Sequence, residues 1–149
     1  MDHGLHKRNA MKTVNKKAMF KYNLGSERIE AGISLTGDEV KAAKRNKVDL
    51  TNSHAKIIGG EVFLVNANIS GADEPTRTKK LLLKKGEIVS IGLKLKRKRL
   101  TFVPTSMYTS KRLIKVSLAL GKSKRGFEKR SSLKERSLKK QIAQEFKNR

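Results

Sequence analysis

The sequence contains no cysteine and no tryptophan, and only 13 of its 149 residues are acidic. Without cysteine the chain can form no disulfide, offers no thiolate nucleophile and cannot bind zinc through sulfur. The acidic residues are dispersed among Lys and Arg, so the sequence lacks the carboxylate cluster that a metal-dependent nuclease requires. Its three histidines, His3, His6 and His54, form no ligand motif. We therefore expect a protein that is not an enzyme and uses neither a metal nor another cofactor.

Long apolar segments are also absent. The longest apolar runs, such as residues 62–65 and 81–83, are far shorter than the span of about 20 residues that a membrane helix needs. Residues 1–10 are polar and do not resemble a signal peptide. We expect a cytoplasmic protein with no membrane partner.

Basic residues are abundant: the chain has 36 Lys and Arg residues and a formal net charge of +23. Such an excess indicates a polyanionic partner, and nucleic acid is favoured because each neutralised phosphate releases counterions. Positive charge is densest in residues 121–149, where 11 basic and 3 acidic residues give +8. We therefore divide the chain into a flexible N-terminus (residues 1–13), a folded domain (14–120) and a basic C-terminal tail (121–149).

Short apolar or alternating segments predict strands over residues 31–35, 54–58, 61–65, 100–103 and 113–120. Gly59 and Gly60 separate the second and third segments, a pattern typical of a β-hairpin. Pro104 predicts an interruption or a sheet edge after the fourth. Alternation from Phe20 to Tyr22 places both rings on one side, where they either pack in the core or stack on RNA bases.

Helix signals are weaker than strand signals. Residues 36–39 read Thr-Gly-Asp-Glu, a capping box that predicts a helix over residues 40–44, ended by Asn46. A second helix is expected in residues 81–91 in spite of Gly86, and residues 94–99 are expected to be a solvated strand or loop. Several strands with two or three short helices predict a mainly β protein. A small antiparallel β-barrel is favoured, because closure hides sheet edges.

The tail combines positive charge with a few apolar side chains. Residues 132–135 form a second capping box, and Leu138, Ile142 and Phe146 recur every four residues. This stripe is too narrow to predict a stable helix in the free protein, so we expect a tail that is disordered alone and helical on binding. Cations surround one aromatic ring at its start: Lys122, Lys124, Arg125, Phe127, Lys129 and Arg130.

Five segments, in this order and spacing, resemble the SmpB family: NKKAMFKY (15–22), EAGISLTGDEVK (30–41), PTRTKKLLL (75–83), LTFVP (100–104) and FEKR (127–130). The resemblance covers roughly residues 14 to 140. It implies a β-barrel of the oligonucleotide-binding (OB) type that binds the tRNA-like domain of transfer-messenger RNA. It also implies a tail that probes the decoding centre and the empty mRNA channel of a stalled ribosome. The expected partners are therefore transfer-messenger RNA and the ribosome, and we expect a monomer when the protein is bound to RNA.

The chain departs from the family pattern at two places. The stretch from Ile69 to Pro75 is shorter than the usual family loop, which should leave the core intact. In the tail, the family's usual Gly-Lys-Lys appears as Ser123, Lys124 and Arg125. Its Asp-Lys-Arg appears as Glu128, Lys129 and Arg130, which keeps the charge but lengthens the acidic side chain.

Residue types and the resemblance together select the candidate contacts. Cations near aromatic rings suit phosphates and unstacked bases, while Glu30 would accept hydrogen bonds from a base edge or a ribose. The alternatives are a surface salt bridge for Glu30 and scaffold roles for Arg77 and the cations that follow it. The candidate RNA-binding residues are Asn15, Lys16, Lys17, Tyr22, Glu30, Glu39, Lys41, Arg77, Lys79, Lys80, Leu82 and Leu83. The candidate ribosome-binding residues are Lys122, Lys124, Arg125, Phe127, Glu128, Lys129 and Arg130.

Two other classes of protein share this composition. A stoichiometric ribosomal protein also combines high charge, a small β-barrel and a cationic extension. A nonspecific single-stranded nucleic-acid-binding protein would show the same mixture of cations and rings. The identity of the bound RNA separates both from an adaptor for one structured RNA.

Overall fold

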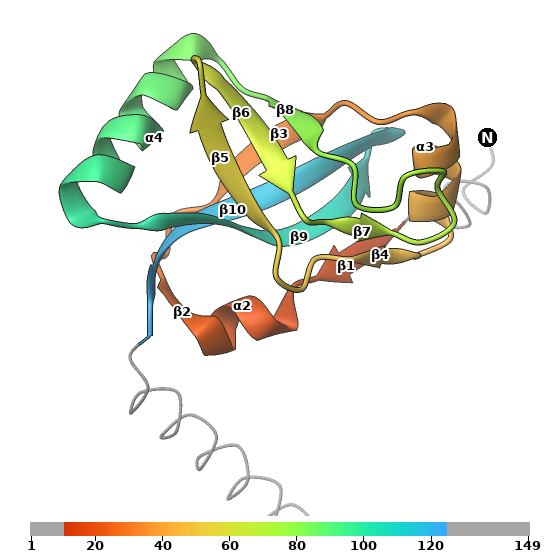
Figure 1. Ribbon diagram of the computed structural model, residues 1–149, viewed down its shortest axis with the longest axis horizontal. Helices are drawn as coiled ribbons and strands as arrows, with labels where there is room; N and C mark the ends of the chain where they lie inside the picture. Colours follow the sequence, from red (N-terminus) through yellow and green to blue (C-terminus); the bar gives the residue numbers. More distant parts are fainter. Residues whose placement is uncertain (1–10, 125–149) are drawn as a thin grey trace, which may run out of the picture.

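Six antiparallel strands close into a ring in the computed structural model, which describes residues 11–124 (Figure 1). Pairing of the last two strands of the chain completes the ring. The predicted mainly β barrel is therefore confirmed, while the expectations for residues 1–10 and 125–149 lie outside the described residues. Residues 11–13, expected to belong to a flexible N-terminus, are instead part of the fold: Met11 is buried, and Lys12 and Thr13 pair with the last-but-one strand of the chain. The order around the ring is β9 (Thr101–Ser110), β5 (His54–Ile58), β6 (Glu61–Val65), β8 (Lys79–Leu82), β3 (Ile29–Ile33) and β10 (Leu113–Ser123).

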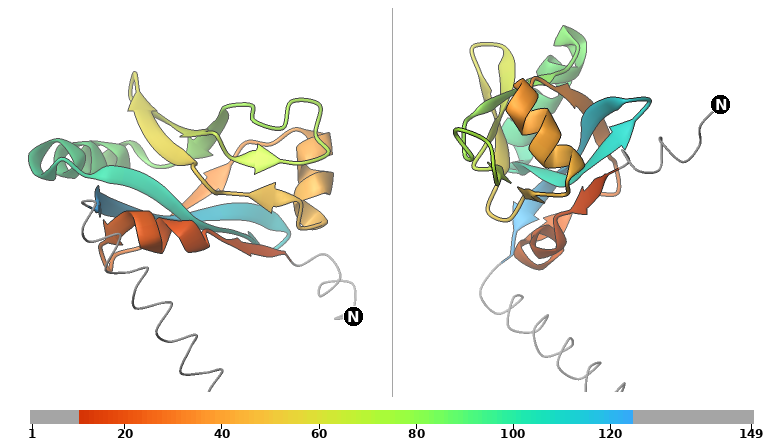
Figure 2. Two further views of the ribbon diagram at one scale, coloured as in Figure 1. Left: turned by 60° about the horizontal axis from the view of Figure 1, so that its bottom comes forward. Right: turned by 90° about the vertical axis from the view of Figure 1, so that its right-hand side faces the viewer.

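Shorter elements extend and cover this barrel. Strand β1 pairs with β9, β2 pairs with β10, and β4 and β7 form a separate two-stranded ribbon. Helices α3 and α4 lie at opposite ends of the barrel, and α2 lies beside β2 (Figures 1 and 2). These elements are β1 (Lys12–Val14), α2 (Lys16–Lys21), β2 (Tyr22–Leu24), α3 (Gly37–Lys44), β4 (Val48–Asp49), β7 (Asn68–Ile69) and α4 (Lys85–Lys98).

Alternate side chains of the strands fill the barrel. Along β10, Ile114, Val116 and Leu118 are buried, as their period of two predicts. Phe102 and Met107 of β9 join them, and neither is more than 1% exposed. Where inward and outward positions alternate, as along residues 114–118 of β10, the residues between the buried ones are presented on the outer surface of the barrel.

The predicted hairpin and the first predicted helix are confirmed. Gly59 and Gly60 connect β5 to β6 with φ of +59° and +77°, values that glycine adopts without a Cβ clash. At the start of α3, Thr36 N donates to Glu39 Oε1 at 2.8 Å, and Thr36 Oγ1 accepts from Glu39 N at 3.4 Å. This capping box starts the helix, and Asn46 with φ of 59° follows its end.

The expected second helix is wrong in position. Residues 79–82 form β8, whose Leu81 is buried between partners in β3 and β6, and α4 starts only at Lys85. The helix begins there because Glu87 Oε1 accepts from Lys84 N at 3.2 Å, and Gly86 is tolerated in the first turn. The expectation of a strand or loop over residues 94–99 is also wrong, since α4 continues to Lys98.

Alternation from Phe20 to Tyr22 is wrong because residues 16–21 are helical. Phe20 lies half-buried on α2 and Tyr22 begins β2, so the two rings do not share a strand face. Propensity favours this outcome, since Lys, Ala and Met are good helix formers.

Pro104 and the end of β10 refine the predicted boundaries. Strand β9 continues through Pro104, and the register between β9 and β10 shifts at the next residue, as at a β-bulge. Strand β10 continues to Ser123, which pairs with Tyr22. Strand pairing therefore extends three residues beyond the predicted domain boundary at Leu120.

Candidate nucleic-acid interface

The outward-facing side chains of β1, β9, β10 and β3 form one continuous surface, here called the outer sheet face. Strand register places Glu30 opposite Ser117 and Ser117 opposite Ser106. Lys115 and Tyr108 form the next pair along the same two strands. The face thus carries one carboxylate among cations and hydroxyl groups, a mixture that can bind both phosphates and ribose or base edges.

Glu30 is held on this face by two partners from other strands. Its Oε1 accepts from Lys115 Nζ at 2.9 Å, and its Oε2 accepts from the Tyr108 hydroxyl. Hydrogen bonds from Tyr108 and Lys115 hold the pKa of Glu30 below its usual value. Burial and the hydrogen bond to Glu30 raise the pKa of Tyr108 to about 12. The carboxylate therefore stays ionised and the phenol stays protonated near neutral pH.

The salt bridge that was the alternative for Glu30 is present, but it does not occupy the whole carboxylate. The Glu30 side chain is 52% exposed in this pair. Carboxylate oxygens accept more than one hydrogen bond each. Glu30 can therefore accept bonds from RNA while Lys115 and Tyr108 hold its position.

Gly32 links Glu30 to the candidate Leu82. It lies two residues after Glu30, on the same face of β3, and pairs with Leu82 of β8. A Cβ at this position would come within 3.4 Å of the Leu82 side chain. Because glycine leaves that space, the exposed Leu82 side chain lies over β3 beside the outer sheet face.

Helix α2 presents a second group of candidates. Lys16 and Lys17 are exposed, and Tyr22 follows the helix half-buried in β2. Asn15 differs: its side chain is buried, and its Nδ2 donates to Leu50 O at 3.1 Å and Pro104 O at 2.9 Å. The geometry does not support direct RNA contact by Asn15; the residue instead fixes α2 against the barrel.

Glu39, Arg77 and Lys79 form a third group that is mostly buried. The Glu39 side chain is 2% exposed and accepts from Arg77 Nη2 at 2.6 Å and from Arg77 Nε at 3.2 Å. Lys79, 0% exposed, places its Nζ 3.7 Å from Glu39 Oε2 and donates to Arg77 O at 2.6 Å. Glu39 and Lys79 are therefore structural in this geometry, contrary to their expected contact with RNA, and Arg77 is only partly accessible.

The pKa values of both Glu39 and Lys79 are lowered in this cluster. Burial opposes ionisation of Glu39, but hydrogen bonds from Arg77 and Thr36 outweigh it and hold the pKa of Glu39 below its usual value. Burial lowers the pKa of Lys79 and the Glu39 charge only partly restores it. The cluster joins α3 to β8 and to the shortened loop, where Asp73 N donates to Asp38 Oδ2 at 2.9 Å. Ile69 before that loop is 0% exposed, so the core below it is closed.

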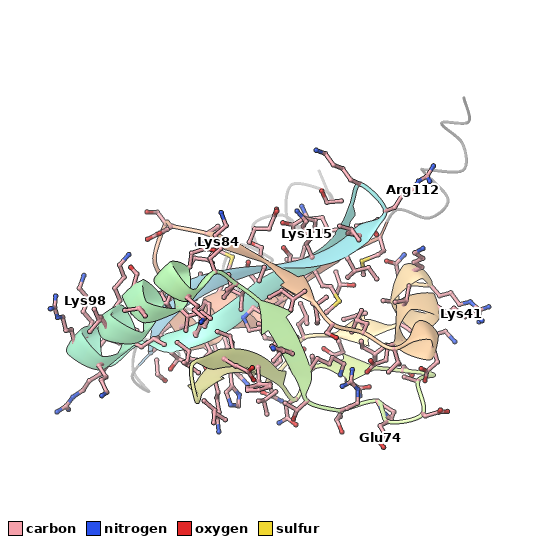
Figure 3. The ribbon with its side chains drawn as sticks, turned by 90° about the horizontal axis from the view of Figure 1, so that it is seen from above. Lys41, Glu74, Lys84, Lys98, Arg112 and Lys115 are labelled. Atoms are coloured by element: carbon pink, nitrogen blue, oxygen red, sulfur yellow. The ribbon has the colours of Figure 1, made fainter. Side chains whose placement is uncertain are left out.

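The remaining candidates divide between surface and core. Lys41 is exposed on α3 (Figure 3), and Lys80 is exposed with its Nζ 3.1 Å from Glu61 Oε1. Leu83 packs against the core cluster and is not a free contact. Of the proposed tail residues, Lys122 lies in β10 and Lys124 N donates to Lys21 O at 2.9 Å. Arg125, Phe127, Glu128, Lys129 and Arg130 lie outside the described residues.

Sequence reasoning missed Tyr108 and Lys115. Alternation along residues 113–120 does point Lys115 outward, but its contact with Glu30 joins residues 85 positions apart. Tyr108 lies 78 positions from Glu30. Only the strand order brings the three side chains together.

Other kinds of site are not evident in residues 11–124. Within that part of the chain, no group of three or more His, Asp or Glu side chains is arranged to hold a metal ion. None of the helices described is long and apolar enough to cross a membrane.

A small closed β-barrel with a mixed cationic and hydroxyl-rich outer face defines a nucleic-acid-binding module. The family model described as SmpB protein matches residues 12–148. The SsrA-binding protein of Trichormus variabilis is 42% identical over 144 residues, covering 91% of this chain and 92% of its own length. That of Streptococcus agalactiae is 41% identical over 141 residues, with 90% of each chain covered. The chain belongs to the SmpB family.

A solved structure supports the same assignment at the level of the fold. It is described as "tmRNA-SmpB: a journey to the center of the bacterial ribosome". It superposes with a TM-score of 0.64 at 36% identity, covering 79% of this chain and 86% of its own. The OB-type barrel implied by the sequence motifs is thus confirmed.

Proposed function

We propose that this chain is an RNA-binding adaptor that binds the tRNA-like domain of transfer-messenger RNA and delivers that RNA to stalled ribosomes. The observation that carries the proposal is the family match over residues 12–148, which includes both the barrel and nearly all of the tail. The protein acts by recognition and positioning, and the ribosome is the place of its action, in the cytoplasm.

The outer sheet face and α2 are the proposed RNA-binding surface. Glu30 supplies an acceptor for base or ribose donors, and Leu82 supplies apolar contact next to it. Lys16 and Lys17 supply cations for phosphates. The tail from Lys122 onward is proposed to enter the decoding centre and the empty mRNA channel.

The proposal is tested by the RNA that the tagged full-length protein captures from a bacterial lysate. We expect transfer-messenger RNA to dominate the sequenced RNA, and random RNA to compete poorly for binding. Ribosomal RNA retained stoichiometrically at high salt would indicate a ribosomal protein instead. Equal competition by random single-stranded RNA would indicate a nonspecific binder.

Specific binding should weaken strongly as salt rises. Because several phosphate contacts release counterions, doubling the salt concentration should lower the affinity for the tRNA-like RNA by several-fold. Filter binding between low and moderate ionic strength measures the slope. An affinity that stays constant over this range contradicts a phosphate-dominated interface.

Replacing Glu30 tests the acceptor role. Glu30→Ala should weaken binding of the tRNA-like RNA by roughly five- to a hundredfold, as expected for loss of a base-edge or ribose contact. The matched control is Glu61→Ala, which removes a carboxylate of similar exposure, 51% against 52%, that is also paired with a lysine. If the two variants bind equally well and Glu30→Ala only melts earlier, Glu30 is structural.

A further inference from the structure

A pocket of about 420 Å³ opens at one end of the barrel, between the second half of α4 and the connection from β2 to β3. Four apolar side chains from four different segments line it, and each is only half-buried: Leu24, Ile29, Leu100 and Leu120. Its volume is within the range of about 300–1,000 Å³ that is usual for small-ligand sites. The pocket therefore has the size and the apolar lining to hold a flat ring.

The rim of this pocket is charged. Lys94 and Lys98 lie one turn apart on α4, so both face the same side of the helix. Glu27 from the β2–β3 connection places its Oε2 3.4 Å from Lys94 Nζ. Lys98 forms no ion pair with any residue of the described range 11–124. Figure 3 shows it at the end of α4, at the opposite end of the molecule from Lys41.

Further cations lie close to Lys98 in the sequence. Residues 94–99 contain five basic residues and no acidic one: Lys94, Lys96, Arg97, Lys98 and Arg99. Cations in the last turn of a helix are common because they offset the helix dipole. Two of the five, Lys94 and Lys98, line the pocket, and an apolar pocket with a cationic rim matches a ligand that is both flat and anionic.

We propose that this pocket holds one unstacked nucleotide of the bound RNA, with its base against the apolar side chains and its phosphates at Lys98 and the adjacent cations. The Glu27 carboxylate can accept a hydrogen bond from an amino group of the base. An apolar peptide side chain would fill the same volume, but it would gain nothing from the cations. The inference rests on the proposed RNA-binding function and adds a site to it.

The position of β3 makes this site compatible with the outer sheet face. Ile29 points into the pocket, and the next residue, Glu30, points to the outer sheet face. Neighbouring residues of a strand are only about 3.3 Å apart along its axis. Because the two side chains point to opposite faces of β3, an RNA that contacts Glu30 would pass the end of this strand to place a nearby nucleotide in the pocket.

Filling the pocket is the first test. Ser26 is exposed and lines the pocket, so Ser26→Leu places an apolar side chain where the base would lie without changing the charge. Affinity for the tRNA-like RNA should fall roughly fivefold or more, the effect of losing one stacked base. Ser70→Leu makes the same change at another exposed loop position, near α3, and should bind like the parent. Equal affinities of the parent and Ser26→Leu overturn the proposal.

The cationic rim is tested in the same way. Lys98→Gln should weaken binding more than Lys85→Gln, which removes the same charge from the other end of α4. Equal losses mean that α4 contributes only long-range attraction, which contradicts a nucleotide site. Thermal unfolding of each variant identifies any loss that comes from misfolding.

Crosslinking of the unaltered protein gives a readout that needs no variant. Full-length protein bound to tRNA-like RNA that contains 4-thiouridine should crosslink to peptides spanning residues 23–29 or 94–100. Specific binding with crosslinks only elsewhere overturns the pocket inference and leaves the proposed function intact. Failure of the parent to bind this RNA specifically would instead overturn the proposed function.

Discussion

Glu39→Ala should lower the free energy of unfolding by roughly 3–5 kcal/mol, because it leaves the buried Lys79 ammonium without its charge partner. It also removes the capping box of α3. Arg77 loses two hydrogen bonds but remains partly accessible to water. Urea denaturation of the full-length protein at neutral pH measures the change.

An exposed pair on a neighbouring strand supplies the control. Glu61→Ala removes the partner of Lys80, and both of these side chains are about half exposed. Its cost should be about 0–1 kcal/mol, since water solvates the remaining lysine. Glu39→Gln combined with Lys79→Met should recover most of the stability, because it removes both buried charges. A Glu39→Ala cost no larger than that of Glu61→Ala contradicts the structural role of the cluster.

The same cluster predicts a pH dependence. Because folding lowers the pKa of Glu39 from its ordinary value of 4.5, the stabilisation is present above that value. It is lost as the pH falls through the lower pKa of the folded state. Glu39→Gln should therefore lose less stability than the parent on acidification. Asp38, Asp49 and Glu30, whose pKa values are also lowered, remain in both proteins, so the difference between the two curves reports Glu39.

Truncation after Lys124 should abolish most ribosome rescue while leaving specific RNA binding largely intact. It removes nine basic and three acidic residues, including Phe127. Loss of a stacked ring and several phosphate contacts amounts to roughly 3 kcal/mol, so rescue should fall by about a hundredfold or more. RNA affinity should fall only modestly, through weaker long-range attraction. Peptide tagging on ribosomes stalled at the end of a truncated message, beside filter binding, measures both.

The position of the truncation matters because β10 does not end at Leu120. Truncation after Leu120 also removes the pairing of Gly121 with Leu24 and of Ser123 with Tyr22. That shorter protein should therefore unfold at lower temperature than the one ending at Lys124. Equal thermal stability of the two proteins would show that the pairing of β2 with β10 contributes little to the fold.

Charge reversal gives the sharper comparison at constant length. Lys129→Glu with Arg130→Glu should reduce rescue strongly with little effect on RNA binding. The control is Lys111→Glu with Arg112→Glu, which changes the same two residue types at the exposed turn between β9 and β10. It should lower rescue only as far as it lowers RNA binding. Normal rescue by the reversed tail would make the tail a solubility extension.

Local sequence patterns determined the elements whose cause is local. Two glycines in a row between apolar segments adopt the positive φ of a tight turn without a clash, so the hairpin at Gly59 and Gly60 was predictable. The capping box at Thr36 and Glu39 joins residues three apart, and the alternation of residues 113–120 shows which side chains face inward. The net charge of +23 and the absence of cysteine depend on composition only; the charge indicates a polyanionic partner, and the lack of cysteine excludes disulfides and thiolate chemistry, whatever the fold.

The predictions from sequence are wrong where contacts with residues far along the chain decide between helix and strand. Residues 79–82 carry a pattern compatible with both, and pairing with β3 and β6 makes them a strand. The site shows the same division. The sequence predicted Glu30 as an RNA contact, but only the barrel places Tyr108 and Lys115 beside it. Glu39 and Lys79 were also predicted from the sequence as RNA contacts, but packing of α3 against β8 buries both side chains. Burial and pairing are set by strand order across the whole ring, and no local pattern encodes that order.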